Sequence, residues 1–319
     1  MSVLIPIFLG LIGLLAIAGI GLFVFSRSTA KKVEEALPPR GPVTRVSGGA
    51  IHAVKQGEGP PILFIHGLSG SLANFTHSTT GPLSADFTTI AIDRPGCGHS
   101  ERDADEQARL PEQARLIAEF IEREGLEKPL IVGHSLGGAV ALTLAMNHPD
   151  KVGALGLIAP LTAVQEGPPG VFAALNHPAP LQRKLIANTL AVPMGARNGP
   201  KALKLVFAPG EPPEDFSLRG GGLLNLRPKG FYAASTDMLA IPKDIEAISA
   251  RYGEITAPIG MIYGDDDKVL HADTHIQAVL DAQPDMHLQR LPGVGHMVQF
   301  CRPDETEAFI RTMAARRAS

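Results

Sequence analysis

The sequence predicts an α/β protein with a mostly parallel central sheet and helices on both faces. Strand patterns and helix patterns alternate along most of the chain, which is the arrangement that gives such a sheet. Several strand candidates are continuous apolar runs, as expected for strands covered on both sides. The length of 319 residues, of which 45% are apolar, is enough for one large domain with a substantial core.

The chain begins with an apolar segment. Residues 3 to 25 contain no charged side chain, and 23 residues at 1.5 Å per residue cover the roughly 30 Å hydrocarbon core of a bilayer. Residues 1–26 are therefore predicted to be a single transmembrane helix. The alternative is a cleaved signal peptide, since Ser28 and Ala30 are small residues suited to cleavage. The long apolar run and the lack of Lys or Arg before it favour the retained anchor.

Two features of this anchor bear on how the protein sits in a membrane. Basic residues follow the span and none precedes it, so the positive-inside rule places the C-terminal domain in the cytoplasm, in the inner or plasma membrane. These residues are Arg27, Lys31, Lys32 and Arg40. Small residues along the span allow close helix pairing, which makes a homodimer through the transmembrane helix an alternative to a monomer. They are Gly10, Gly13, Gly19 and Gly21.

Residues 27–43 are polar and contain prolines, so they are predicted to be a juxtamembrane linker with a short helical piece through "KKVEEAL". The α/β core is then expected in two parts, residues 44–160 and 243–319. The predicted strands are "AIHAVKQ", "ILFI", "FTTIAI", "PLIVG", "ALGLI", "PIGMIYG" and "HLQRL". The predicted core helices lie in residues 104–125, 136–149, 272–283 and 303–317.

Residues 161–242 interrupt this alternation. The segment lies between two sheet strands, is rich in Pro, Gly, Leu and Ala, and contains no strong strand pattern. It is too long for a structureless loop, so we predict a helical cap inserted after the sixth strand, over the strand ends. Its eight basic and five acidic residues give a charge of 8 − 5 = +3. A basic, apolar cap suits anionic lipid headgroups or acyl chains, and an ordinary solvated face is the alternative.

Composition excludes several classes of function. The net charge is −3 and no long basic block occurs, so no nucleic-acid partner is expected. Cys97 and Cys301 are the only cysteines, too few for a disulfide framework and without zinc-site spacing. We expect no metal and no organic cofactor.

The segment Gly133-His134-Ser135-Leu136-Gly137 fits the pattern G-x-S-x-G between a predicted strand and a predicted helix. So sharp a reversal brings backbone segments close together, which requires glycine on either side of the central residue. Ser135 is then exposed at the end of the sheet, at the N-terminus of a helix that supplies partial positive charge. An ordinary tight turn is the alternative for the five residues alone.

A nucleophilic serine needs a base and a carboxylate that orients the base. His296 follows the last predicted strand in a glycine-flanked loop, and Asp267 follows the strand before it. The order Ser, Asp, His suits a nucleophile at this type of turn. Asp266 is the main alternative for the acid, and Asp265 and Asp266 are expected to cap the turn.

The other histidines are expected to have structural roles. His66 and His134 lie beside motif glycines and are predicted to bond to loop backbone. His99 is assigned to a turn after a strand. His271 and His275 are predicted to lie on an exposed helix.

Acyl transfer also needs N–H donors aimed at the oxyanion of the tetrahedral intermediate. The residue after the nucleophile, Leu136, supplies one backbone N–H. A second is expected from Leu68, where "HGLSG" bends the chain after a strand, and Gly67 keeps that approach open.

Five segments in order resemble the motifs of the α/β-hydrolase superfamily, over about residues 44 to 316. The segments are "FIHGLSGS", "AIDRPGCGHS", "VGHSLGG", "YGDDDKVL" and "LPGVGHMVQF". The resemblance implies an α/β-hydrolase fold with a catalytic triad. The N-terminal span and the cap add a similarity to membrane-anchored monoacylglycerol lipases and to bacterial membrane-anchored phospholipases A.

The chain departs from the superfamily pattern at two positions. Cys301 stands where many relatives carry a glutamate after the catalytic histidine. Superfamily members that act as haloalkane dehalogenases or epoxide hydrolases carry an aspartate at the position of Ser135, so serine argues against both activities.

The sequence therefore predicts a membrane-anchored serine esterase or lipase that hydrolyses carboxylic esters of lipid-derived acyl groups, such as a monoacylglycerol or a phospholipid. One alternative is hydrolysis of a carbon–carbon bond in a ring-cleavage product. Another is a non-catalytic binding protein with the same fold.

Overall fold

The computed structural model describes residues 4–165 and 170–317. Among these residues the central sheet has nine strands, with the order β1-β2-β4-β3-β6-β7-β8-β9 and with β5 paired to β2 at one edge. The strands are β1 Val43–Val46, β2 Gly49–Gln56, β3 Pro61–Ile65, β4 Thr88–Ile92, β5 Glu101–Arg102, β6 Leu130–His134, β7 Ala154–Ile158, β8 Ile259–Gly264 and β9 His287–Leu291.

The sheet is parallel from β4 to β9, and β1, β2 and β5 pair antiparallel at the other edge. Strands β6, β7 and β8 are buried at every residue, which explains their continuous apolar sequences. Because parallel strands end at the same edge, the loops after β3, β6, β8 and β9 gather there. The alternation in the sequence thus produces the predicted α/β fold.

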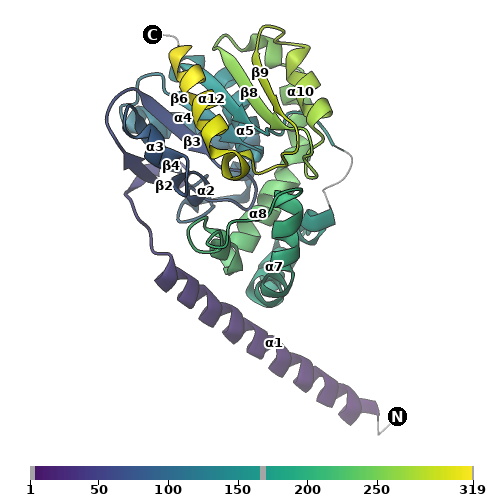
Figure 1. The fold of residues 1–319 in the computed structure, drawn as a ribbon. Coiled ribbons are helices and arrows are strands. Elements are labelled where there is room, and N and C mark those ends of the chain that lie inside the picture. The colour runs from purple at the N-terminus through teal and green to yellow at the C-terminus, as the bar shows by residue number, and fades with distance from the viewer. Residues whose placement is uncertain (1–3, 166–169, 318–319) are drawn as a thin grey trace.

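Helices cover both faces of the sheet (Figure 1). On one face α12 (Pro303–Ala315) contacts β6, β7 and β8 and packs beside α3 (Thr80–Leu83). On the other, α5 (Leu136–Asn147) contacts β3, β6 and β7 and packs beside α4 (Leu110–Arg123). The shorter core helices are α2 Ala73–Thr76, η1 Asp105–Ala108, η2 Pro149–Lys151, α9 Ile245–Ser249, η6 Tyr252–Glu254, α10 Ala272–Leu280 and α11 Val298–Cys301.

The segment between β7 and β8 is helical where it is described. It contains η3 Gly170–Leu175, α6 Pro180–Asn188, α7 Ala191–Phe207, η4 Gly222–Leu226, α8 Pro228–Ala240 and η5 Ile241–Lys243. Strand β5 lies off the main path of the sheet, so β7 is the sixth strand of that path, after which a helical cap was predicted. Residues 166–169 of the predicted cap lie outside the described residues. Figure 1 shows α7 and α8 on the side of the core nearest to helix α1.

Helix α1 runs from Leu4 to Ala36 and projects away from the core (Figure 1). Its apolar side chains from residue 7 to residue 17 are exposed, and the helix is long and apolar enough to cross a membrane. At 1.5 Å per residue its 33 residues measure about 50 Å, more than a bilayer core of roughly 30 Å needs. The last third of the helix is therefore available for contacts with the protein.

That last third packs against the cap. Val33 and Leu37 form a small apolar cluster with Leu224 of η4. Glu34 lies 3.7 Å from the buried guanidinium of Arg227, and Ser26 Oγ donates to the carbonyl of Thr189 at 3.1 Å.

The segment predicted as a linker is thus helical and packed over its first ten residues, 27–36. The sequence predicted only a short helical piece there, because the apolar contacts that stabilise a helix of this polarity come from η4, far along the chain. The helix ends where Pro38 and Pro39 disfavour helical geometry in the residues before them. The sequence interpretation also missed β1 and β5, two short strands that continue the antiparallel edge.

Candidate active site

Ser135 lies at the turn between β6 and α5 in a strained conformation, with φ 54° and ψ −122°. Such a backbone costs about 1 to 3 kcal/mol in a residue that carries a side chain, so the surroundings must hold it. Its N–H donates to the carbonyl of Ile158 at 3.0 Å, and its carbonyl accepts from the N–H groups of Gly138 and Leu161. Three backbone contacts thus fix the turn, in which Ser135 is buried rather than exposed as predicted.

Two glycines of this turn are required by close approach. A Cβ on Gly137 would lie 2.1 Å from the carbonyl oxygen of Ile65, and one on Gly133 would lie 2.5 Å from the carbonyl oxygen of Gly137. Both distances are far below van der Waals contact. Glycine at these two positions therefore lets α5 begin in direct contact with the end of β3. The strained Ser135 lies in the turn between the two glycines.

The loops after β8 and β9 bring Asp267 and His296 together. Asp267 Oδ2 lies 2.7 Å from His296 Nδ1, and both side chains are buried. Asp267 Oδ1 accepts from the N–H groups of Val269 and Leu270 at 2.7 and 3.0 Å. Burial alone would raise the pKa of Asp267, but His296 and these N–H groups outweigh it and hold the pKa below its usual range.

The neighbouring aspartates have different partners. Asp266 accepts from the N–H of Gly293 at 2.9 Å, and Asp265 lies 2.7 Å from the guanidinium of Arg290. The prediction that these two aspartates cap their own turn is therefore wrong: their side chains connect the loop after β8 to β9 and to the loop after it, and Asp267 Oδ1 accepts from the N–H groups of the turn. Of the three, Asp267 is the carboxylate in contact with the imidazole.

His134 brings the loop of His296 against the turn of Ser135. Its Nε2–H donates to the carbonyl oxygen of His296 at 3.1 Å, and the two imidazole rings lie 4.9 Å apart. The structure thus gathers Ser135 and the paired His296 and Asp267 at one edge of the sheet.

The loop after β3 lies directly beside the turn. A Cβ on Gly67 would come within 2.9 Å of the Cβ of Ser135, so the two loops touch. The N–H groups of Leu68 and Leu136 donate to no other group within the described part of the chain. Leu136 is the first residue of α5, and the first N–H groups of a helix have no partner within the helix. A developing oxyanion is an acceptor that would satisfy both.

His66 holds the loop after β3 in place. Its Nε2 accepts from the N–H of Arg94 at 2.9 Å, so the other ring nitrogen carries the proton and donates to the carbonyl of Gly67 at 2.8 Å. Burial and the nearby Arg94 lower the pKa of His66 to about 4. His66 is therefore neutral and structural at physiological pH.

Arg94 is a residue that the sequence interpretation did not single out. It is fully buried, and its guanidinium donates to the carbonyls of His66 and Gly67 at 2.9 and 3.1 Å. The same guanidinium lies 2.8 Å from the carboxylate of Asp237 in α8, which also pairs with Arg102. Arg94 thus connects the loop of Leu68 to the cap. The signal was the charged pair Asp93-Arg94 placed directly after the buried strand β4.

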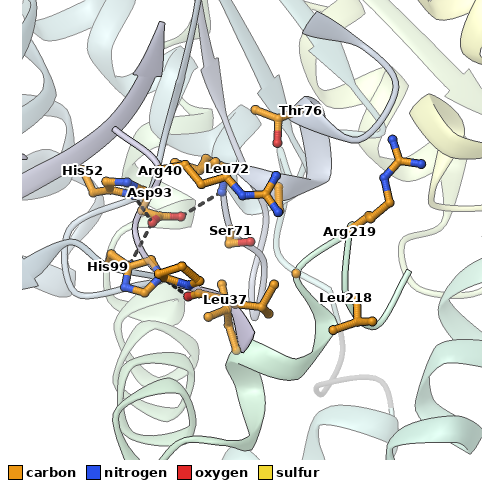
Figure 2. Close-up of a pocket in the computed structure, with 14 residues that line it drawn as sticks. Leu37, Arg40, His52, Ser71, Leu72, Thr76, Asp93, His99, Leu218 and Arg219 are labelled. Atoms are coloured by element: carbon orange, nitrogen blue, oxygen red, sulfur yellow. Dashed lines mark hydrogen bonds and ion pairs between the residues drawn. The ribbon is translucent and has the colours of Figure 1, made fainter. Parts of the chain in front are cut away.

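Asp93 organises a second buried cluster near the end of α1 (Figure 2). Its carboxylate accepts from His52 Nδ1 and from the N–H groups of Leu72 and His99, each at 2.8 Å. A cavity of about 40 Å³ adjoins this cluster, and neither Ser135 nor His296 lines it. His99 donates to the carbonyl of Leu37, the residue after α1, at 3.0 Å. His99 therefore connects the end of α1 to the core, a contact that its assignment to a turn did not predict.

One histidine assignment is wrong. His275 was placed on an exposed helix, but it is fully buried and faces the loop after β7. Its Nδ1 accepts from the N–H groups of Thr162 and Ala163 at 3.1 and 3.2 Å. The apolar pattern of α10 is too short to fix which face is covered, so the sequence did not reveal this burial. His271, at the start of the same helix, is exposed as expected.

We expect the protein to lose stability as the pH falls from about 6.5 towards 4. Burial lowers the pKa of His66 and His275 to about 4 and that of His134 to about 3, whereas the unfolded chain takes up protons near 6.5. Within this window the unfolded state binds more protons, so each histidine lowers the free energy of unfolding by up to about 1.4 kcal/mol per pH unit. Melting temperatures in detergent at pH 7.5 and 5.5 check this expectation.

The exposed His271 supplies the control for this experiment. Replacing it by glutamine should leave the dependence of the melting temperature on pH unchanged. A melting temperature that stays constant between pH 7.5 and 5.5 would contradict the neutral, buried state of the three histidines.

The fold and these loops define a hydrolase of the α/β class. The family model described as alpha/beta hydrolase fold matches residues 60–303, and the chain belongs to this family. Full-length curated relatives include haloalkane dehalogenase 2 of Mycobacterium tuberculosis, 26% identical over 83% of this chain and 91% of the relative. They also include 2-hydroxy-6-oxo-6-phenylhexa-2,4-dienoate hydrolase of Burkholderia cepacia, 26% identical over 83% of this chain and 90% of the relative.

Solved structures share the fold at lower identity. A membrane phospholipase A described as a bacterial virulence factor is 22% identical, with a TM-score of 0.67 over 97% of this chain and 98% of the other. The enol-lactonase of Burkholderia xenovorans is 18% identical, with a TM-score of 0.67 over 86% of this chain and all of the other. The first similarity spans nearly the whole length of this chain.

Proposed function

We propose that this protein is a membrane-anchored serine esterase that hydrolyses carboxylic esters of lipid-derived acyl groups. The observation that carries the chemistry is the strained Ser135 at the same sheet edge as the buried His296–Asp267 pair. A serine hydroxyl is a weak nucleophile until a base removes its proton, and a histidine with a fixed tautomer is such a base.

In the proposed reaction Ser135 Oγ attacks the ester carbonyl carbon while His296 Nε2 takes the hydroxyl proton. Asp267 accepts from Nδ1–H and stabilises the imidazolium that forms. The tetrahedral intermediate collapses to an acyl-enzyme, and the imidazolium protonates the departing alcohol. Water then attacks the acyl-enzyme with the same base, which releases the acid and restores Ser135.

The N–H groups of Leu68 and Leu136 are proposed to bind the oxyanion of both intermediates. Loss of a single donor of this kind lowers kcat by about 10²- to 10³-fold. The support is their lack of another acceptor together with the contact between the loop of Gly67 and the turn of Ser135.

The proposal of a lipid substrate rests on the surfaces around the cap. Leu181 and Leu185 of α6 are 83% and 66% exposed, and Leu190 and Met194 extend this apolar surface towards α7. Both cap helices contact α1, the helix proposed to enter the membrane. Exposed apolar groups next to a membrane helix suit contact with acyl chains. The phospholipase A with which this chain shares its fold is itself a membrane protein.

We expect removal of residues 1–25 to lower hydrolysis of bilayer esters at least tenfold while short soluble esters are hydrolysed at close to the full rate. This cut keeps Ser26, Glu34 and Leu37, which pack on the cap, so the fold should survive. The measurement compares vesicle-borne monoacylglycerol and phospholipid with p-nitrophenyl butyrate for the full and shortened proteins. Equal losses on both kinds of substrate would contradict the role of the anchor.

Sidedness and self-association are further proposals that only the sequence supports. The basic residues after the span favour a cytoplasmic catalytic domain, and the glycines of the span favour pairing of two anchors. Labelling of introduced surface cysteines from either side of sealed vesicles tests the first, and cross-linking within the span tests the second.

A second candidate is hydrolysis of a carbon–carbon bond in a dienoate, the activity named for the relative from Burkholderia cepacia. The same nucleophile, base and oxyanion donors would serve it. The exposed apolar cap and the anchor favour esters of lipids instead. If the protein hydrolysed such a dienoate but none of the monoacylglycerol, phospholipid and p-nitrophenyl esters named above, carbon–carbon bond hydrolysis would become the favoured function.

A further inference from the structure

A polar cleft of about 450 Å³ lies between the cap, the core and the polar end of α1. Neither Ser135 nor His296 lines it. Four parts of the chain contribute to its wall: α1 through Arg27, the loop that leads from β4 to η1, helix α6 through Lys184, and helix α8 through Lys229 and Tyr232. We refer to it as the cationic cleft.

The charges around the cationic cleft do not cancel. Asp105 is paired with Arg183 at 2.6 Å, and Arg102 is paired with the buried Asp237 at 2.6 Å. By contrast, Arg27, Lys184 and Lys229 take part in no ion pair within the described residues, and Lys229 donates only to the carbonyl of Ser100. Among the described residues that line the cleft, Asp103 is the one carboxylate without an ion pair. A net positive charge therefore remains for an incoming anion, and the nearby cluster in which Arg94 and Arg102 share the single carboxylate of Asp237 adds to it.

The position of the cationic cleft indicates where that anion comes from. Arg27 follows Phe25, the last residue of the uncharged run, by two positions. If α1 spans the membrane, as proposed above, Arg27 lies where the hydrocarbon core gives way to phosphate headgroups. Lys184 is flanked on α6 by the exposed Leu181 and Leu185, against which acyl chains can pack.

We propose that the cationic cleft binds the phosphate-bearing headgroup of an anionic phospholipid from the facing leaflet, at a site separate from Ser135. Arg27, Lys184 and Lys229 supply the opposing charge, and Leu181 and Leu185 contact the acyl chains. This inference rests on the proposed membrane anchoring. The bound lipid would connect α1 to α6 and α8 and so fix the cap against the membrane surface.

The test uses the full chain in detergent with Ser135→Ala, so that no lipid is hydrolysed during the measurement. Calorimetric titration gives the dissociation constants of short-chain phosphatidylglycerol, short-chain phosphatidylcholine and glycerol phosphate. We expect the anionic lipid to bind roughly tenfold more tightly than the zwitterionic lipid, since each cation near a headgroup contributes several-fold. Because both lipids can also enter the site of Ser135, the ratio of their constants is the informative quantity.

In the double variant Arg27→Gln with Lys184→Gln, the ratio of the two lipid dissociation constants should fall close to one. The charge-conserving double variant Arg27→Lys with Lys184→Arg should keep the ratio of the unsubstituted site. The matched control is Lys201→Gln with Lys204→Gln, two exposed lysines of α7 outside the cleft, which should leave the ratio unchanged. An equal fall in the control pair, or no fall in the first pair, would overturn the proposal. Glycerol phosphate binding as tightly as the lipid would overturn the assignment to a lipid.

These outcomes are separable from the fate of the proposed ester hydrolysis. The binding ratio is measured on a protein that lacks the Ser135 hydroxyl, so it does not depend on catalysis. If the protein with Ser135 hydrolysed no ester while the lipid preference persisted, the hydrolysis proposal alone would fail.

Discussion

Ser135→Ala is expected to lower ester hydrolysis by about 10⁴- to 10⁶-fold without unfolding the protein, because the hydroxyl is the proposed nucleophile. The substitution removes one oxygen atom and keeps the backbone contacts that hold the strained turn, which are made by the N–H and the carbonyl. The measurement is the rate on p-nitrophenyl butyrate, together with labelling by a fluorophosphonate probe, which should disappear.

Ser71→Ala provides the matched control for this variant. Ser71 is also buried, and its hydroxyl has no hydrogen-bond partner among the described residues. Its removal should leave both activity and labelling close to those of the unsubstituted protein. Labelling that persists in Ser135→Ala would show that another residue is the nucleophile.

Asp267→Asn is expected to lower kcat for ester hydrolysis by about 10³- to 10⁴-fold, the second large effect. Oδ1 of Asp267 accepts from two backbone N–H groups, so an asparagine would keep its carbonyl oxygen there and turn its amide group towards His296. The amide donates to Nδ1, which moves the imidazole proton to Nε2. That nitrogen can then no longer take the proton of Ser135.

Asp266→Asn is the control, since Asp266 bonds to the N–H of Gly293 and not to His296. An asparagine oxygen can accept the same bond, so little activity should be lost. If the two variants lost activity equally, the orienting carboxylate would not be Asp267. Near-ultraviolet circular dichroism of both variants shows whether the fold is retained.

Much of the fold followed from periodicity alone. Seven predicted strands correspond to β2, β3, β4, β6, β7, β8 and β9. Most of them are compact apolar runs between turn residues, whereas β2 and β9 contain polar residues as well. Helices such as α4 carried an apolar face, which α5 and β1 cover. What the sequence could not predict depends on distant contacts. The helical extension of α1 to Ala36 is stabilised by Leu224, and the burial of His275 by Thr162.

The candidate site likewise contains residues that the sequence predicts and residues that only distant contacts reveal. Ser135, Asp267 and His296 were selected because local turn chemistry marks each position, and the structure gathers them at one edge. No local turn pattern identifies Arg94 or Asp237 as residues of the site. Their partnership joins residues 143 positions apart and becomes visible only when α8 is placed against the loop after β4. The cationic cleft is likewise formed by four separate parts of the chain.

The pairing of Asp237 with Arg94 and Arg102 also limits how a substrate can enter. Asp237 is completely buried between the two guanidinium groups, and removing one partner of such a pair typically costs about 3 to 5 kcal/mol because a buried charge is left without compensation. Any movement of the cap that admits a substrate must therefore either leave α8 in place or expose these three charges to water together.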